Sequence, residues 1–209
     1  RDAFRAVGLP AGPSEVMVLA DNSARAEFVA ADLLSQAEHG DDSQAILVCR
    51  TERFARQVTR AVEEQIRYLS RGEAIRNSLA NSRIVLFDEE YKQIAFANAY
   101  APEHLIVSMR DAWGIAAKIT AAGSVFIGNY SPESAGDYAS GTNHTLPTGG
   151  WARACSGVNV DSFMRKITFQ ELTRDGLDAL APAITAMAEA EGLDAHANAV
   201  RVRMKGGIL

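Results

Sequence analysis

The sequence predicts an α/β protein built on a parallel sheet with flanking helices, followed by a helical C-terminal region. Short apolar segments alternate with amphipathic segments of helical length over most of the chain. Strands separated by helices of this length require crossover connections, and crossovers join parallel strands. Towards the C-terminus the apolar strand-like segments stop and helical patterns remain. We therefore expect an α/β domain at residues 1–155 and a helical region at residues 156–209.

The composition is that of an ordinary globular protein. The chain has 209 residues, 47% of them apolar and 22% charged, with a formal net charge of -5. Lysines and arginines are scattered, so we expect neither a nucleic-acid partner nor a membrane-binding surface. No apolar run approaches the roughly 20 residues that span a bilayer. Two cysteines, Cys49 and Cys155, fit a reducing cytosol, which predicts a cytoplasmic location.

The first part of the chain contains two predicted strands, each followed by a helix. Residues 16–20 and 45–49 are short apolar runs, as in buried strands. Between them, apolar residues recur at helical spacing over residues 23–39, and a glycine follows as a stop signal. Thr51 is expected to cap the second helix, whose apolar stripe extends to Leu69.

Three further strands are predicted in the same way. They lie at residues 84–87, 105–109 and 124–128. A short helix is expected near residues 89–98, and a helix capped by Asp111 is expected to end at Gly123. Sheets of this kind bind ligands at the carboxyl ends of their strands, so we expect the functional site there.

The segment 129–160 departs from this alternation. It is rich in Gly, Ser, Asn, Thr and Pro, which predicts a long functional loop. Gly136 and Gly141 neither follow a strand directly nor open a helix, so they do not form a dinucleotide-binding fingerprint. A mostly helical region is expected from about Ser162 onward.

Histidine and carboxylate residues supply the candidate site. A single histidine is more often structural than functional, so the residues around each histidine determine whether a functional role is expected. Gln36 and His39 stand three residues apart on a predicted helix and share a face beside its apolar stripe. They either line a cleft at the end of that helix or form a polar flank. Asp137 and His144, within one small-residue loop, suggest ligand contacts, although a surface linker also tolerates that composition.

Two further pairs combine a carboxylate with an imidazole. Glu103 and His104 lie between Pro102 and a predicted strand. They are either two proton-transfer groups or a structural pair at the start of the strand with Glu103 solvated. Glu191 ends a helix whose apolar residues are expected to face inward, and it is expected on that same face. A carboxylate there opposes the helix dipole, so it is either solvated at the helix end or meets a cation. His196 follows five residues later.

Together these segments resemble the C-terminal part of histidinol dehydrogenase. The resemblance begins at Ala11-Gly-Pro-Ser-Glu15 and depends on Ser35-Gln-Ala-Glu-His-Gly40, Ala101-Pro-Glu-His-Leu105 and Ser131-Pro-Glu-Ser-Ala-Gly-Asp-Tyr-Ala-Ser-Gly-Thr-Asn-His144. This family oxidises L-histidinol to L-histidine through an aldehyde, in two NAD-dependent steps, for histidine biosynthesis. The resemblance implies an incomplete Rossmann-like sheet, because the family's first strands precede the matched part.

The resemblance also implies roles for individual residues. The implied zinc ligands are Gln36, His39, Asp137 and His196. The implied acid–base pair is Glu103 and His104. The implied substrate contacts are Ser14, Gln36, His39, His104, Asp137, His144, Glu191 and His196. In the family, the segment with Glu191 and His196 reaches the neighbouring subunit's site, so a homodimer is implied.

These residue types suit the implied chemistry. Imidazole and carboxylate groups are good zinc ligands, and zinc would orient the substrate without carrying electrons. His104 would accept the alcohol proton, and Glu103 would activate water for attack on the aldehyde.

One departure from the family leaves two functions open. The family's chain is roughly twice as long, and the region that receives most of the NAD has no counterpart here. The sequence begins with Arg1, so we expect it to be part of something longer. The chain is therefore either a dehydrogenase or a zinc- and histidinol-binding fragment that is inactive without its NAD-binding part. A third alternative is a zinc hydrolase with Glu103 as the base.

Overall fold

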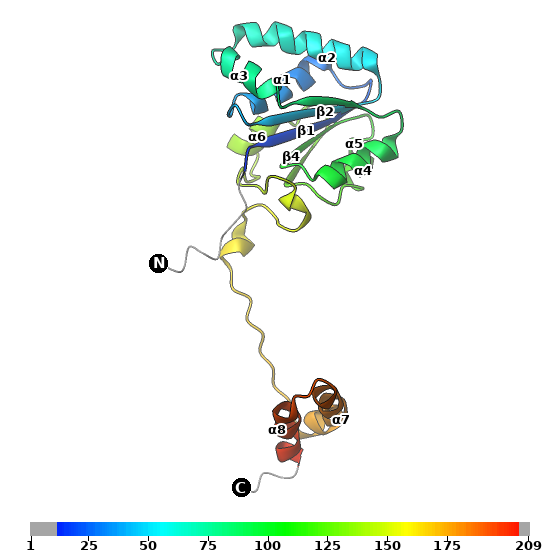
Figure 1. The fold of residues 1–209 in the computed structure, drawn as a ribbon, viewed down its shortest axis with the longest axis vertical. Helices are drawn as coiled ribbons and strands as arrows, with labels where there is room; N and C mark the ends of the chain where they lie inside the picture. The colour runs from blue at the N-terminus through cyan, green and yellow to red at the C-terminus, as the bar shows by residue number, and fades with distance from the viewer. Residues whose placement is uncertain (1–11, 205–209) are drawn as a thin grey trace. The chain divides into compact units, whose positions relative to one another are not determined.

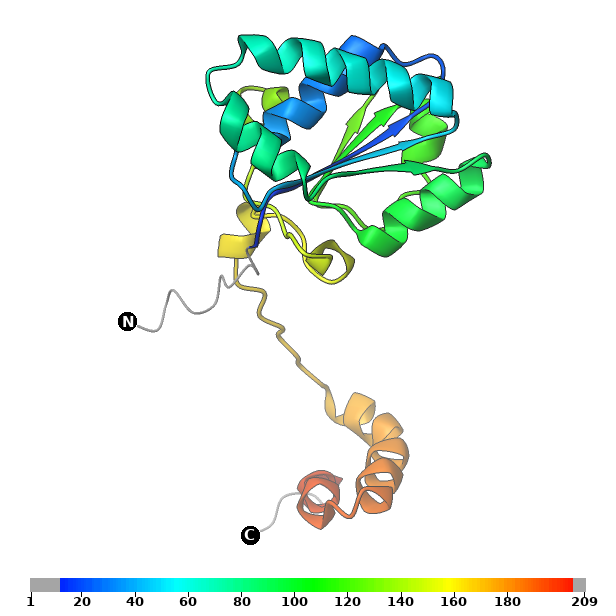
Figure 2. The ribbon, with the colours of Figure 1, turned by 45° about the horizontal axis from the view of Figure 1, so that its top comes forward.

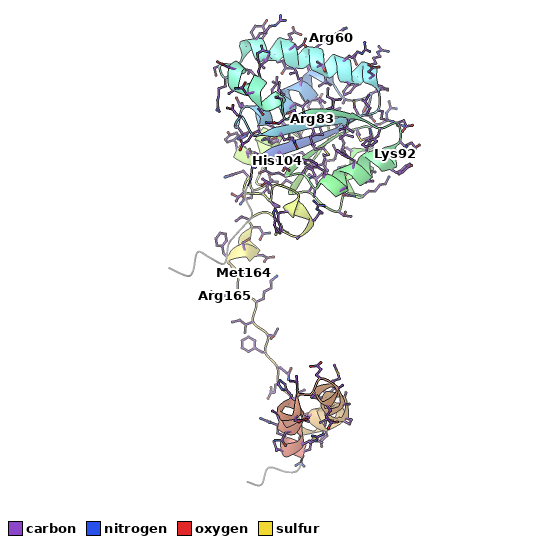
Figure 3. All side chains as sticks on the ribbon, in the orientation of Figure 1. Arg60, Arg83, Lys92, His104, Met164 and Arg165 are labelled. Atoms are coloured by element: carbon purple, nitrogen blue, oxygen red, sulfur yellow. The ribbon has the colours of Figure 1, made fainter. Side chains whose placement is uncertain are left out.

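The computed structural model describes residues 12–204 and divides into two compact units, Arg1–Met164 and Arg165–Leu209. Figure 3 labels Met164 and Arg165, where one unit passes into the other along the chain. Each unit is described by itself below. Within the described residues, no helix is long and apolar enough to cross a membrane.

The N-terminal unit is built on a five-stranded sheet in the order β3-β2-β1-β4-β5. The strands are β1 (Glu15–Ala20), β2 (Gln44–Cys49), β3 (Arg83–Leu86), β4 (His104–Ser108) and β5 (Ser124–Ile127). Every neighbouring pair is parallel. The predicted parallel α/β fold is confirmed, and each of the five predicted strands is present within about one residue.

Helices cover both faces of this sheet (Figures 1 and 2). Val16 and Val18 of β1 pack with α1 (Ala26–Ala37) and α2 (Glu52–Gln65) on one face. The alternate residues Met17 and Leu19 pack with α4 (Glu90–Tyr100) and α5 (Ala112–Ala116) on the other. A strand sends successive side chains to opposite faces, so a central strand covered on both sides is apolar throughout.

The second helix begins as predicted and ends earlier. The side chain of Thr51 accepts a hydrogen bond from the backbone N–H of Phe54 at 3.2 Å, which confirms the predicted cap. The helix ends at Gln65, and the 3-10 turn η2 (Ile66–Tyr68) and α3 (Gly72–Leu79) follow. The prediction that Leu69 continues the buried stripe is wrong, because the chain turns at Ile66, which packs against Ile75 of α3.

The helix after β4 is also shorter than predicted. Asp111 caps α5 by accepting from the N–H of Gly114 at 3.1 Å. The helix stops at Ala116 and does not reach Gly123. The side chain of Asn98 on α4 explains this, because it donates to the carbonyl of Lys118 and accepts from the N–H of Thr120. These backbone groups are therefore held by a neighbouring helix instead of a continuing one.

The prediction that the segment 129–160 is one long loop is only partly right. It contains α6 (Glu133–Tyr138) and the 3-10 turn η3 (Trp151–Arg153), and the turn η4 (Val160–Phe163) begins at its end. Gly136 lies inside α6, where a Cβ atom would stand 2.4 Å from Cε1 of Phe126 on β5. The absence of a side chain at this position lets α6 lie close against the sheet.

The C-terminal unit consists of α7 (Arg174–Ala190) and α8 (Asp194–Met204). Its buried apolar residues among those described are Ala181, Ala188, Ala197 and Val200. Leu180 and Met187, which the sequence places inward, are 47% and 66% exposed. Two helices alone cannot enclose the apolar stripes that both of them carry, so larger side chains remain outside.

Candidate functional site

The candidate site lies at the amino edge of the sheet. Ser14 immediately precedes β1, and Glu103 and His104 stand where the adjacent strand β4 begins. Helix α1 returns from the carboxyl edge, so Gln36 in its last turn and His39 just after it lie back at the amino edge. The prediction of a site at the carboxyl ends of the strands is therefore wrong. Figure 3 labels His104 at this edge.

One cleft brings most of the predicted residues together. It has a volume of about 440 Å³ and is lined by Ser14, His39, Glu103, His104, Asp137, Tyr138 and His144. Four separate segments of the chain contribute, namely the approach to β1, the residues after α1, the start of β4 and the region of α6 with the loop after it. The sequence predicted six of these seven residues as site residues, and their roles stay predictions.

The carboxylate of Glu103 is buried and held in one orientation. Its Oε2 atom accepts hydrogen bonds from Oγ of Ser14 at 2.6 Å and from the backbone N–H of Glu15 at 2.8 Å. Both donors belong to residues that enter β1, the strand paired with β4. The pairing of these two strands therefore fixes where the carboxylate points.

The same strand orients the imidazole of His104. Its Nδ1 lies 3.1 Å from the carbonyl oxygen of Glu15. A carbonyl can only accept, so Nδ1 carries the hydrogen and the neutral ring has its lone pair on Nε2. That Nε2 atom is buried without a hydrogen-bond partner and lies 3.7 Å from Oδ1 of Asp137. His104 thus presents a proton-accepting nitrogen to the cleft.

Glu15 is a positioning residue that the sequence reasoning missed. Its backbone contacts both Glu103 and His104, and its side-chain Oε1 accepts from the N–H of Gly149 at 2.7 Å. Burial, with a smaller effect from the charge of Glu103, raises its pKa against the opposing effect of the Gly149 hydrogen bond. The sequence feature that could have indicated it is a glutamate at the first position of an otherwise apolar strand.

A second group of side chains can hold a metal ion. The ligand atoms of His39, Glu133 and Asp137 all lie within 4.8 Å of one another. Nε2 of His39 is 4.0 Å from Oε1 of Glu133. Glu133 and Asp137 are four residues apart on α6, so both face the same way. An imidazole with two carboxylates is a donor set that zinc accepts.

Glu133 is the second residue that the sequence reasoning missed. Burial raises its pKa to about 8, and the charges of Asp137, Asp32 and Glu103 add to that shift. Burial also raises the pKa of Asp32 on α1 to about 7. The sequence feature that could have indicated Glu133 is its position four residues before Asp137, within a motif that supports the resemblance.

Gln36 supplies an independent indication of a bound group. Its side chain is 0% exposed, and neither its amide oxygen nor its amide nitrogen has a hydrogen-bond partner. An unpaired buried amide costs free energy unless something satisfies it. Gln36 lies in the last turn of α1, and His39 follows two residues after the end of that helix. The cluster of His39, Glu133 and Asp137 and the unpaired amide of Gln36 are therefore compatible with a metal ion.

Three turns at the carboxyl edge of the sheet lack the glycines of the dinucleotide fingerprint. The turns that follow β1, β2 and β4 comprise residues 21–25, 50–51 and 109–111, and none contains glycine. The dinucleotide fold needs glycines in the first such turn, because the backbone must approach the pyrophosphate closely. These three turns therefore do not carry that glycine pattern.

Glu191 and His196 belong to the C-terminal unit, so the geometry above comes from the N-terminal unit alone. Glu191 is the C-cap of α7, and His196 lies in the first turn of α8. Both residues are exposed. Of the two alternatives for Glu191, solvation at the helix end agrees with its exposed position as the C-cap of α7 in the single chain.

Comparison with known proteins agrees with the motifs. The family model described as Histidinol dehydrogenase matches residues 4–204. Histidinol dehydrogenase from Bacteroides fragilis (strain YCH46) is 58% identical over 200 residues, covering 96% of this chain and 47% of the relative. The enzyme from Legionella pneumophila (strain Lens) is 51% identical over 199 residues, covering 95% and 46% respectively.

A solved structure is similar over the same range. The crystal structure of histidinol dehydrogenase from Elizabethkingia anophelis matches with a TM-score of 0.90 and 56% sequence identity. The match covers 94% of this chain and 46% of that chain. The chain thus spans about half the length of the relatives that it matches.

Proposed function

Because the chain belongs to the histidinol dehydrogenase family, we propose that it carries the zinc- and substrate-binding part of an enzyme that oxidises L-histidinol to L-histidine with NAD. The observation that carries this proposal is the cleft at the amino edge of the sheet. There an oriented carboxylate and an oriented imidazole lie beside a cluster able to hold a metal ion. We also expect a cytoplasmic location, as for other biosynthetic enzymes of this kind.

The proposed zinc site has the four ligands that the family resemblance implies. Gln36, His39 and Asp137 would hold the ion from the N-terminal unit, and His196 would complete the set. Bound zinc would supply a Lewis acid that orients the polar atoms of the substrate, without redox chemistry of its own. The buried unpaired amide of Gln36 supports its place in this set.

The proposed proton chemistry belongs to Glu103 and His104. The unpartnered Nε2 of His104 would take the proton of the substrate alcohol, and the carbonyl of Glu15 would hold the opposite edge of the ring. Glu103 would take a proton from the water that attacks the aldehyde. Ser14 and the backbone of Glu15 keep its carboxylate oriented for that step.

The remaining proposed substrate contacts lie in both units. Ser14 and His144 line the cleft beside the acid–base pair. Glu191 would meet a positively charged group of the substrate, which an exposed carboxylate at a helix end is free to do.

We further propose a homodimer in which Glu191 and His196 serve the site of a second copy. The C-terminal unit exposes large apolar side chains, among them Phe169 at 92% and Met187 at 66%. Such side chains mark surfaces that are covered by a partner. A second copy of the chain would cover them and bring the C-terminal unit to a neighbouring cleft.

A binding-only function is the second candidate. The glycine-free turns after β1, β2 and β4 favour it, because NAD would then be held by a part of the enzyme outside this chain. Such a chain would bind zinc and histidinol without oxidising the substrate.

Calorimetry followed by a dehydrogenase assay tests both candidates. We expect the metal-free chain to bind zinc, and the zinc-loaded chain to bind histidinol. Histidinol binding that does not depend on zinc would contradict the proposed site. NADH formation on addition of NAD would assign the complete activity to this chain, and binding without NADH would assign the binding-only function. His104→Ala should retain zinc in either case and abolish any NADH formation.

A further inference from the structure

The two edges of the sheet in the N-terminal unit differ in how well they are covered. Helices pack over both faces at the centre of the sheet, where β1, β2 and β4 are almost entirely buried. In the edge strand β3, Ile84 and Leu86 are each 46% exposed. At the opposite edge, all residues of β5 are at least partly buried. The cover of the sheet therefore ends before it reaches β3.

Only one face of β3 is uncovered. Ile84 and Leu86 pair with Leu47 and Cys49 of β2, which belong to the core on the side of α1 and α2. Paired residues of neighbouring strands point to the same face of a sheet, so Ile84 and Leu86 belong to that side as well. The alternate residue Val85 packs into the core on the side of α4. Helix α4 thus reaches β3, whereas α1 and α2 leave Ile84 and Leu86 exposed.

An apolar hollow opens beside these two residues. It has a volume of about 240 Å³, and Val58 and Val62 of α2, Leu79 of α3 and Ile84 are among the residues that line it. Among the strands that the structure describes, β3 alone carries large apolar side chains that are exposed. Native proteins cover or charge such an edge, because an apolar edge strand promotes aggregation. The hollow and the exposed pair therefore indicate a surface that is covered by a partner.

The shape of this surface favours a helix as its cover. A strand added beyond β3 would lengthen the uncovered apolar face, whereas a helix laid over it would bury Ile84 and Leu86 and extend the layer of α1 and α2. Arg83, labelled in Figure 3, also lines the hollow, and its guanidinium donates to the carbonyls of Ala80 and Ser82. The helix is therefore expected to be amphipathic, with an acidic residue beside its apolar stripe.

The relatives supply a source for such a helix. This chain covers 47% of the Bacteroides fragilis enzyme and 46% of the Elizabethkingia anophelis structure, so more than half of each relative lies outside the match. A polypeptide of that length has ample sequence for an amphipathic helix. A second copy of this chain is less suitable, since its C-terminal unit is already assigned to the cleft at the amino edge.

We propose that the face of β3 with Ile84 and Leu86 is the docking surface for an amphipathic helix from the N-terminal part of the family's chain. The inference deepens the proposed function and rests on it, because the docked part is the one that would hold NAD. Strands β2 and β1 lie between β3 and β4, so docking at β3 leaves the cleft at β1 and β4 open.

Co-expression with the N-terminal part of a relative tests the docking surface. The probe is the portion of the Bacteroides fragilis enzyme that precedes its 200 matched residues. We expect it to purify with the tagged full chain. Ile84→Asp and Leu86→Asp should each weaken the complex at least about tenfold, because a charge would be buried in an apolar contact. The absence of a complex with the wild type would overturn the inference.

The matched control is Tyr91→Asp. Tyr91 is an exposed residue of α4, the helix that covers the other face of the sheet at β3. We expect this variant to change the affinity for the N-terminal part less than about threefold, since it introduces the same charge outside the proposed surface. An equal loss in Tyr91→Asp and Ile84→Asp would contradict a contact at β3. So would an oligomeric state that changes in Ile84→Asp without the N-terminal part, because that result assigns the surface to a second copy.

Hydrogen exchange in the wild type locates the contact without any substitution, and it decides the matter if a variant fails to fold. We expect the backbone amides of β3 to exchange more slowly in the complex, because the docked helix opposes local opening of the edge strand. Amides of β5, at the opposite edge of the sheet, should exchange at the same rate with and without the N-terminal part. A complex in which β3 is not protected would refute the proposed surface.

Binding of zinc and histidinol separates this inference from the proposed function. Ile84→Asp should bind both as the wild type does, because two strands lie between β3 and the cleft. A wild-type chain that binds zinc and histidinol but not the N-terminal part would refute only the docking surface. A chain that binds the N-terminal part through β3 but neither zinc nor histidinol would refute the proposed function and support the docking surface.

Discussion

At the residue scale, the backbone of Glu15 contacts both side chains of the proposed acid–base pair. Its N–H orients the carboxylate of Glu103, and its carbonyl fixes the hydrogen of His104 on Nδ1. Neither contact depends on the glutamate side chain, which is occupied with Gly149. Position within a paired strand, more than residue type, is what this part of the site requires.

The amount of zinc bound by single variants should distinguish the proposed ligands from other residues of the cleft. We expect His39→Ala and Asp137→Ala each to lower bound zinc sharply, because each removes a donor from the cluster at the end of α1. His144→Ala is the control, since it lines the same cleft outside that cluster. Zinc measured by atomic emission decides the matter, and full zinc in both ligand variants would exclude this site.

Asp32 should make the metal-free chain lose stability as the pH rises. Burial raises its pKa from 3.8 to about 7, so between these values the folded chain binds more protons than the unfolded chain. Stability therefore falls between about pH 4 and pH 7. We expect Asp32→Asn to remove this contribution, so that its gain over the wild type in urea unfolding is larger at pH 8 than at pH 5. An equal difference at both pH values would show that Asp32 is ionised freely in the folded chain.

At the scale of elements, the site is built from the ends of α1 and β4 together with α6. Helix α1 crosses the face of the sheet, and its length places Gln36 and His39 beside the first residues of β4. Helix α6 then adds Glu133 and Asp137 from a segment that has few apolar residues. Two short helix ends and one strand start thus supply groups that lie about 100 residues apart in the sequence.

The close packing of α6 on β5 should be needed for the metal site. Gly136→Ala would place a methyl group 2.4 Å from Phe126 and 2.7 Å from Oγ1 of Thr142, so α6 would have to move. We expect a loss of stability of about 1–3 kcal/mol, as for other overpacked sites, and a lower zinc affinity. Ser134→Ala, at an exposed position of the same helix, should leave both unchanged. Urea unfolding and chelator competition measure the two effects, and wild-type zinc affinity in Gly136→Ala would separate the site from this packing.

At the scale of the whole molecule, the two units differ in how well they bury their apolar residues. The sheet of the N-terminal unit is covered on both faces, whereas α7 and α8 bury small side chains and leave large ones exposed. A pair of helices with so little buried surface is poorly stable alone. The second copy proposed above would supply the missing cover.

The oligomeric state should therefore depend on the exposed apolar residues of the C-terminal unit. We expect the chain to sediment as a dimer, and Phe169→Ser together with Met187→Ser to shift it towards the monomer, because both side chains are largely exposed in the single chain. Tyr68→Ser, at an exposed aromatic residue of the N-terminal unit, is the matched control and should remain dimeric. Sedimentation velocity over a range of concentrations measures this, and a monomeric wild type would contradict the proposed assembly.

The sequence by itself determined the local structure and the family. Apolar runs and helical periodicity located all five strands, and hydrogen-bonding side chains located the caps at Thr51 and Asp111. These patterns are visible because they depend on neighbours within a few residues. The matched motifs also selected six residues that share one cleft.

Only the tertiary structure decided where those residues meet and which others join them. The order of strands places β1 beside β4, so Glu15 reaches Glu103 and His104, and no local pattern specifies that pairing. The early ends of α2 and α5 depend on contacts with Ile75 and Asn98 from other helices. No role was predicted for Glu133, because its place in the cluster depends on His39. That residue lies nearly 100 positions earlier in the sequence but close to Glu133 in space. Periodicity is a property of neighbours in the chain, whereas a site is a property of neighbours in space.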